Sequence, residues 1–564
     1  MPGEAVTLQL GHYSGCVGAH WWGLQAAALR GPTEPAELRA AALLRFGRGP
    51  GGTESPAPRL VALELKGGVG ALGAAGAGDE PPVTWDGAVA DYRERAPGDA
   101  GSAGSRGVSA AAAPCPGRGR GRGDGGGKGN PGAAGPGSSP AGSQEPPSLR
   151  LWSDYLNVQL HPKSVYVIRQ YLHDGDCGCL GAFGQGESLL QDSACVEELE
   201  DRLHFFVEEC DYLQGFQVLC DLHDGFSGVG AKVTELLQDE YSRKGILTWG
   251  LTPALSPVGD PQKSFCRLMN TALGIAHLSR HSSLFCPLSL SGTLGIKPEP
   301  PVTFPYINYN ASLNYHSSSI LAAALDTFTA PYRLCSSQGS MLHFADSLTF
   351  SGRKVVAAWA ALPFPAPSGS SLPDILSAHQ DVPWKLLSSW KEQKGSCCFA
   401  QSVVLRGICQ EKKATSSCLG QPSSPLHSCE SPEQMLQQYL HTQFPGAFST
   451  SHVLQQPCHT QPPFPQFFSP LLTRRGFLLD KAQGISSAGV GSIPVLAALQ
   501  SCPGLARLLR GLCRELRARR CSSSCAAGLE HDDFQEALEE MKSLAQCYET
   551  GFGADGSEDE ADSD

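Results

Sequence analysis

The chain has 564 residues, of which 43 are lysine or arginine and 55 are aspartate or glutamate, so its formal net charge is −12. This length allows two or more domains with sizeable cores. The negative charge argues against general nucleic-acid binding, because nucleic acids attract basic surfaces. The 21 cysteines are scattered and odd in number, which favours a reducing cytosolic compartment with free thiols.

The sequence predicts no targeting or membrane-spanning segment. It begins Met-Pro-Gly-Glu, its first basic residue is Arg30, and it shows neither a secretory signal nor an arginine-rich transit pattern. The longest clean apolar run, 355–362, is too short to cross a bilayer. We therefore expect any association with a membrane to be peripheral.

Strands and helices alternate in the first half of the chain. The expected strands are short and mostly apolar and have turn residues beside them; they cover 5–10, 60–65, 165–169, 216–222 and 245–249. Apolar residues recur at helical spacing between 195 and 210, and again after the glycine-rich segment 225–230. This alternation predicts a parallel α/β sheet whose glycine loop offers backbone N–H groups to a phosphate.

Residues from about 96 to 148 are dominated by glycine, alanine, proline and serine. They cannot bury enough apolar surface to offset the loss of chain entropy, so we expect a disordered insert. Gly-Arg repeats at Arg118, Arg120 and Arg122 leave an RNA-binding segment as an alternative. Because the basic run is short, a tolerated loop is the favoured interpretation.

The second half contains fewer clear elements. Residues 354–362 and 402–406 predict strands, whereas 411–432 is a loop rich in serine, proline and cysteine. Two C-terminal helices are predicted from apolar faces that core packing explains; the faces consist of Leu505, Leu508, Leu509, Leu512 and Leu516, and of Phe534, Leu538, Met541, Leu544 and Tyr548.

Several segments resemble one family. Residues 208–218 (EECDYLQGFQV) resemble the segment that leads into the glycine-rich phosphate loop of tubulins, and 11–22 (GHYSGCVGAHWW) resembles their first nucleotide loop and helix. Residues 532–549, with the acidic tail behind them, are similar to the last tubulin helix. Two further motifs, LELKGG at 63–68 and WSDYL at 152–156, are similar to the misato family of tubulin-related proteins.

The resemblance implies a tubulin-like α/β fold. It would comprise an N-terminal Rossmann-like domain of the nucleotide-binding type with a parallel sheet, a central helix, a second α+β domain, and C-terminal helices with an acidic tail. The implied segments are 1–95 and 149–264 for the first domain around the insert 96–148, 265–280 for the central helix, 281–470 for the second domain, 471–550 for the C-terminal helical region and 551–564 for the disordered tail.

The resemblance also locates the phosphate loop, where tubulins carry three glycines followed by Thr, Gly, Ser and Gly. The matching residues run from Asp224 to Gly230. Ser227, Gly228 and Gly230 keep a hydroxyl and the small residues that a close phosphate requires. Asp224 would place a like charge beside the phosphate, and Phe226 would add bulk.

Other contacts that the resemblance implies are also altered. Gly11 persists in the first loop, but His and Tyr follow it in place of Gln and Cys. Gly181 is followed by Ala and Phe where tubulins have two asparagines. Asn270 matches a helix asparagine of tubulin at the ribose and base, and Thr248 stands where another asparagine would be.

The part of this pattern that the chain keeps comprises Gly11, Gly181, Ser227, Gly228 and Gly230, which we interpret as vestigial nucleotide-binding residues. No cofactor is expected, and structurally bound GTP is the alternative.

No catalytic residue is assigned. Asp346 is the nearest candidate for the acidic residue that tubulins present to the next subunit's nucleotide, but its spacing to the following prolines is too long. His12 invites a catalytic interpretation, although a histidine in a loop more often packs or forms hydrogen bonds.

No metal site is predicted either. The pair Cys177 and Cys179 has no partner pair, and Cys521, Cys525 and His531 do not complete a four-ligand spacing.

From this resemblance we expect a regulatory protein that does not hydrolyse GTP and acts on mitochondrial distribution, morphology and fusion. It would be cytoplasmic, peripheral at the mitochondrial outer membrane, and would bind proteins of the mitochondrial surface or fusion machinery. Two alternatives stay open: an active GTP-binding GTPase, and a cytoskeletal or tubulin assembly factor with chaperonin contacts.

Overall fold

A computed structural model describes most of the chain outside residues 71–148. The described ranges are 3–30, 36–48, 54–70, 149–173, 178–254, 261–292, 300–336, 339–388, 397–408, 425–482, 489–518 and 531–549. The insert at 96–148, Cys177, Cys521, Cys525 and the acidic tail therefore lie outside the described residues.

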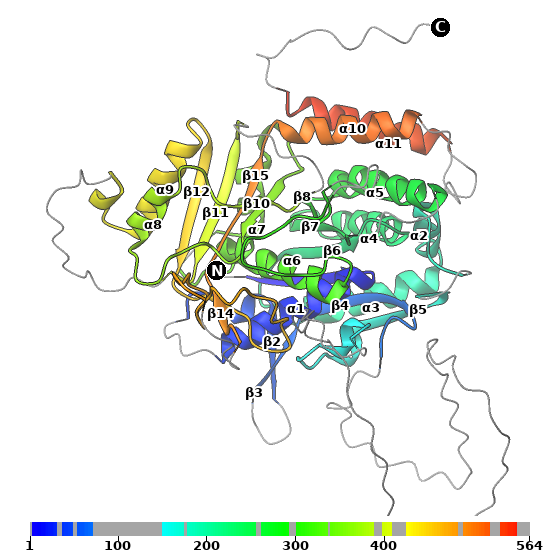
Figure 1. Cartoon of the computed structure of the whole chain (residues 1–564). Helices are drawn as coiled ribbons and strands as arrows, with labels where there is room; N and C mark the ends of the chain where they lie inside the picture. The colour runs from blue at the N-terminus through cyan, green and yellow to red at the C-terminus, as the bar shows by residue number, and fades with distance from the viewer. Residues whose placement is uncertain are drawn as a thin grey trace, which may run out of the picture. The chain divides into compact units, whose positions relative to one another are not determined.

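The first sheet has six parallel strands in the order β5-β4-β1-β6-β7-β8 (Figure 1). The strands are β1 (Glu4–Leu10), β4 (Leu60–Lys66), β5 (Val165–Leu172), β6 (Leu213–Asp221), β7 (Gly245–Thr252) and β8 (Leu284–Ser289). The inner strands are buried on both faces, which explains their nearly continuous apolar sequences. This sheet confirms the predicted α/β, tubulin-like fold class.

Helices cover both faces of this sheet. Val6 and Leu8 of β1 point to the side that packs against four helices: α2 (Phe183–Leu189), α3 (Ser193–Glu208), α4 (Phe226–Glu240) and α5 (Pro261–His281). Ala5, on the opposite face, belongs to the core shared with α1 (His12–Leu29), α6 (Asn314–Phe328) and α7 (Met341–Thr349). The two faces thus form two separate apolar cores.

The second sheet has five strands in the order β10-β9-β15-β11-β12. They are β9 (Ala357–Ala361), β10 (Lys385–Leu386), β11 (Ala400–Arg406), β12 (Phe448–Leu454) and β15 (Val495–Ser501). Only the pair β11 and β12 is parallel; the other neighbours are antiparallel. Helices α8 (Leu372–Ala378) and α9 (Pro432–Gln443) share a core with this sheet.

Two elements fall outside the segments to which the sequence assigned them. The prediction placed 471–550 in a helical region, but β15 lies in the middle of the second sheet, between β9 and β11. The prediction also placed the second domain from 281 onward, whereas β8 is the last strand of the first sheet.

The helix between the two sheets also differs from the prediction. The helix expected at 265–280 is present as α5, but it links the parallel strands β7 and β8 and is therefore a crossover helix of the first sheet. Instead, α6 lies between the sheets: it contacts α1 on one side and β11 and β15 on the other. Its residues are buried from Ser317 to Phe328.

The last two helices in the described part of the chain are α10 (Gly504–Ala518) and α11 (His531–Gln546), which pack side by side and against α5 (Figure 1). Both were predicted from their apolar stripes. The remaining strands form two small two-stranded sheets, β2 (Leu44–Arg48) with β3 (Glu54–Pro58) and β13 (Cys458–His459) with β14 (Ser492–Ile493).

The structure bears on two further expectations, which concern membrane-spanning segments and free thiols. Among the described residues, no helix combines the length and apolarity that a membrane crossing requires. The described cysteines are free thiols except Cys266 on α5, which is joined in a disulfide, so the expectation of free thiols throughout is wrong at that position.

Candidate functional site

The candidate site lies at the carboxyl edge of the first sheet, where β1 and β6 meet. If the six strands of this sheet are numbered 1 to 6 along the chain, their order across the sheet is 3-2-1-4-5-6. This is the strand order of doubly wound nucleotide-binding folds. In such sheets, ligands bind where the strand order reverses, which here is between the ends of β1 and β6. The predicted residues Gly11 and Ser227 follow these two strands.

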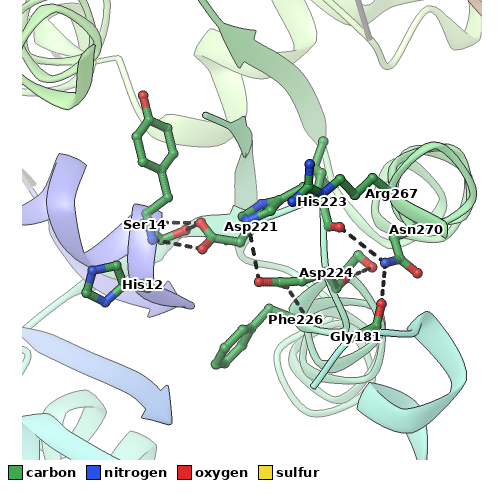
Figure 2. Close-up of polar contacts among 12 residues, drawn as sticks. His12, Ser14, Gly181, Asp221, His223, Asp224, Phe226, Arg267 and Asn270 are labelled. Atoms are coloured by element: carbon green, nitrogen blue, oxygen red, sulfur yellow. Dashed lines mark hydrogen bonds and ion pairs between the residues drawn. The ribbon is translucent and has the colours of Figure 1, made fainter. Parts of the chain in front are cut away.

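Asp221, the last residue of β6, fills the position at the start of α1. Its carboxylate accepts hydrogen bonds from the backbone N–H groups of Tyr13 (2.8 Å) and Ser14 (2.7 Å), and from the Ser14 hydroxyl (2.6 Å; Figure 2). The side chain is completely buried. A helix N-terminus attracts an anion through its free N–H groups, and here the protein supplies that anion itself.

Gly11 makes this contact possible. Its φ is +107°, and a Cβ atom at this position would lie 2.5 Å from Oδ2 of Asp221. Glycine is therefore required at position 11 by a carboxylate of the chain, as well as by the backbone conformation.

Asp224 occupies the corresponding position at the start of α4. Its Oδ1 accepts the backbone N–H of Phe226 at 2.9 Å, and its carbonyl oxygen accepts the Ser227 hydroxyl at 2.7 Å (Figure 2). Asp224 thus acts as a capping residue, which is a common role for aspartate. The prediction that Phe226 adds bulk beside a phosphate is wrong, because Phe226 is 1% exposed and its side chain belongs to the core.

The predicted glycines of the phosphate loop lie inside α4 and serve close packing. A Cβ atom on Gly228 would lie 2.0 Å from the carbonyl oxygen of Phe183, and one on Gly230 would lie 2.5 Å from Sγ of Cys220. These glycines let α4 approach α2 and β6. Their small size is therefore explained by the protein's own backbone and side chains.

The loop around Gly181 closes over the same region. The carbonyl oxygen of Leu180 accepts the N–H of Gly225 at 3.0 Å. Asn270, on α5, accepts the N–H of Phe183 at 2.9 Å and donates to the carbonyl oxygens of Gly181 (2.8 Å) and His223 (3.2 Å). The asparagine that matches a base-binding residue of tubulin is thus fully engaged with the backbone of the two loops.

Burial shifts the pKa values of Asp221, Asp224 and the neighbouring His223. Burial, followed by the charge of Asp224, raises the pKa of Asp221 well above its usual range, although the donors of Tyr13 and Ser14 oppose this rise. Burial also raises the pKa of Asp224. It lowers the pKa of His223, so the neutral imidazole is favoured.

A second cluster of polar side chains, His12, Glu64 and His173, lies beside these carboxylates. The sequence did not predict that these three residues lie together. Nδ1 of His12 donates to Oε2 of Glu64 at 3.1 Å, and the His173 ring lies with its centroid 3.9 Å from that of His12. Burial alone would lower the pKa of His12, but its contacts with Cys16 and Glu64 raise it to about 11. Glu64 was not singled out from the sequence, but this residue belongs to the LELKGG motif, which is the sequence signal that could have identified it.

Two other predicted residues are not part of this site. Thr248 forms a hydrogen bond with Ser282 at 2.6 Å, within the first domain. Asp346, on α7, lines a cavity of about 280 Å³ together with Lys244 and Lys354. Lys244 directly precedes β7, so this cavity lies at the amino end of that strand, opposite to the edge that contains Asp221.

This arrangement does not fit a bound GTP phosphate. The N–H groups at the start of α1 already donate to a carboxylate, and those at the start of α4 face a capping aspartate. A triphosphate would have to displace both carboxylates and lie against their like charges.

Comparisons with known proteins agree with this architecture. Residues 3–102 match the misato Segment II tubulin-like domain, and residues 141–334 match the tubulin domain. Human protein misato homolog 1 is 48% identical over 97% of this chain and 98% of its own length. The zebrafish homolog is 41% identical over 99% of both chains, and Drosophila misato is 29% identical over 97% of this chain and 98% of its own.

The doubly wound first sheet, the helix between the two sheets and the matched domains define a tubulin-like protein. Within this class, the similarity along nearly the whole chain narrows the assignment. The chain belongs to the misato family.

Proposed function

We propose that this protein is a tubulin-like regulatory protein that does not hydrolyse GTP and acts by binding other proteins at the cytosolic face of mitochondria. Its role would lie in mitochondrial distribution, morphology and fusion. The observation that carries the first part of the proposal is Asp221, whose carboxylate accepts the N–H groups of Tyr13 and Ser14.

Electrostatics support this interpretation. Two like charges about 4 Å apart repel by roughly 4 kcal/mol at an intermediate effective dielectric. A phosphate at the start of α1 would meet Asp221, and one at the start of α4 would meet Asp224. A protein that loses its nucleotide contacts in this way keeps the tubulin-like scaffold for other uses, since a fold does not fix a function.

The mitochondrial part of the proposal is supported by the resemblance to the misato family. The partners would be proteins of the mitochondrial surface or of the fusion machinery, and the membrane contact would be peripheral. An assembly factor that contacts the chaperonin, and an active GTPase, are the alternatives that the experiments below separate.

Nucleotide content tests the first part. We expect native protein purified without added nucleotide to release no stoichiometric GTP or GDP on denaturation, and we expect calorimetry to detect no GTP binding. The double variant Asp221→Asn/Asp224→Gly, which removes both charges, should bind GTP measurably if it folds, while Asp211→Gly on the exposed surface should not. Tight binding and turnover of GTP by the wild type would show that the protein is a GTPase.

Fractionation tests the second part. Washing isolated mitochondria with alkaline carbonate should release the protein, because a peripheral protein is held by contacts that this treatment disrupts. Retention in the membrane pellet would contradict peripheral association. Capture of the tagged protein should enrich mitochondrial surface proteins; enrichment of chaperonin subunits in their place would favour the assembly factor.

A further inference from the structure

Three side chains of types that commonly bind metals meet at the carboxyl edge of the first sheet, next to Asp221 but outside its hydrogen bonds. His12 follows β1, Glu64 lies on β4 and His173 follows β5, so they come from three neighbouring strands. One ligand atom of each lies within 4.8 Å of the others. The segments that carry them are far apart in the sequence, so the fold itself brings the group together.

The carboxylate at the centre of this group is held in place. Glu64 is 1% exposed. Its Oε1 accepts the backbone N–H of Leu65 at 2.8 Å, and its Oε2 accepts the indole N–H of Trp152 at 2.9 Å and the ring N–H of His12. Metal ligands are typically oriented by such neighbouring donors and acceptors, which fix the direction of the binding atoms.

The backbone also fixes the third residue. The N–H of His173 donates to the carbonyl oxygen of Lys66 at 3.0 Å, which ties the end of β5 to the end of β4. His173 therefore lies beside Glu64 because of strand pairing and does not depend on the conformation of a long loop.

A second group faces the first from the next strand. Asp221, His223 and Asp224 also bring ligand atoms within 4.8 Å of one another. Nδ1 of His223 is buried and has no hydrogen-bond partner in the part of the chain that the structure describes. His223 interacts electrostatically with His12, and Asp224 with Glu64 and His173, so the two groups are close neighbours.

Three carboxylates at this edge make it a favourable place for a cation. Glu64, Asp221 and Asp224 converge there, and all three are at least half buried. A divalent ion would bind the neutral form of His12 and release its proton, and it would offset the mutual repulsion of the carboxylates, which is stronger in a medium of low dielectric constant than in water. An unpartnered imidazole nitrogen is a favourable acceptor for such an ion or for a water molecule bound to it.

We propose that His12, Glu64 and His173 bind a divalent transition metal, with zinc as the best match, and that the open side of the ion faces His223 and Asp224. Two imidazoles and one carboxylate are a donor set of zinc sites that keep an open coordination position. Magnesium and calcium prefer oxygen ligands alone and fit this set poorly. The proposal is independent of the proposed function, because it concerns a metal and not a nucleotide.

The test is zinc binding by the purified full-length protein after treatment with EDTA and removal of the chelator. Zinc chloride is titrated in competition with a chromophoric chelator, with magnesium chloride in a parallel titration. We expect one tight zinc site per chain and no comparable magnesium site. Glu64→Gln and His173→Gln should each weaken this site by about tenfold or more.

The control is His204→Gln, which removes an exposed histidine that pairs with Glu240 on the outer helices and should leave zinc binding unchanged. Thermal unfolding gives a second readout: zinc should raise the Tm of the wild type and of the control but not of Glu64→Gln. Both glutamine variants keep a polar side chain of similar size, and their Tm without zinc shows whether they fold. The proposal is overturned if the wild type does not compete for zinc, or if folded variants bind it as tightly as the wild type.

Discussion

A single carboxylate, that of Asp221, accepts the backbone N–H groups at the start of α1. Asp221 is the last residue of a buried strand, and no sequence pattern assigns it to the first helix of the protein. The structure places it there because β1 and β6 are parallel neighbours whose carboxyl ends coincide. The sequence shows that Asp224 stands where tubulins have a glycine. Its role as a helix cap depends on the hydrogen bond from the Phe226 N–H, which only the structure shows.

The hydrogen bonds of Asp221 predict a measurable contribution to stability. Asp221→Asn keeps the size of the side chain but turns one acceptor into an N–H group, which leaves a buried backbone donor of α1 without an acceptor. Loss of a buried partner costs about 1–3 kcal/mol. We expect a decrease of that size in the free energy of unfolding measured with urea. The exposed Asp211→Asn should change it by less than about 0.5 kcal/mol, and an equal loss in both variants would contradict this role of Asp221.

At the scale of elements, strands with two buried faces were the most predictable. Their apolar runs stand out in the sequence, as in β6 and β7. The helix between the sheets was assigned to the wrong segment because α6 is buried on nearly all sides and so lacks the polar face that marks a helix. The strand β15 was missed because it lies beyond the last predicted strand and just before the strongly patterned helix α10.

The buried α6 carries an ionic cluster that joins the two sheets. Asp326 accepts from Gln25 on α1, from Arg333 and from Arg406 on β11. Burial alone would raise the pKa of Asp326, but the two arginines lower it below its ordinary value of 3.8. A buried charge cluster of this kind is costly to break, at about 3–5 kcal/mol for the loss of one partner.

This cluster predicts a dependence of stability on pH. Because the pKa of Asp326 is lower in the folded than in the unfolded chain, its contribution is complete above about pH 4 and is lost as the pH falls through the folded pKa. We expect the Tm of the wild type to fall more steeply below pH 4 than the Tm of Asp326→Asn, which should be less stable at pH 7. Parallel acid profiles for the two proteins would show that other carboxylates cause the loss.

At the scale of the whole molecule, the fold class and the two-sheet arrangement followed from the resemblance, and the structure agrees with both. The site could be predicted only in part. Gly11, Gly181, Ser227, Gly228 and Gly230 lie along the edge of the first sheet. Contacts within the protein explain the small size of the three glycines 11, 228 and 230 and bind the Ser227 hydroxyl, whereas a Cβ atom at position 181 would meet only Sγ of Cys179, at 3.7 Å. Contacts between segments more than a hundred residues apart cannot be read from local patterns, which is why His173 and Asp221 were not foreseen.

The described residues on either side of the insert lie close together, which favours its removal. Residues 103–140 lie outside both matched domains. On either side of the undescribed stretch 71–148, the chain is held together: the N–H of Gly70 donates to the hydroxyl of Ser153 at 3.0 Å, and Val69 and Leu149 pack against the same core. The two ends are therefore close, and residues 71–95 are long enough to connect them after a deletion.

We predict that a protein lacking residues 96–148 folds with a Tm within a few degrees of the wild type. The composition of this segment offers little apolar surface to bury, so its removal takes away few stabilising contacts. Differential scanning calorimetry of the two proteins measures the change. A matched truncation that removes residues 531–549 should lower the Tm strongly, because the hydroxyl of Tyr548 both donates to and accepts from the backbone of Val355. Loss of soluble protein on deletion of 96–148 would show that the insert stabilises the fold.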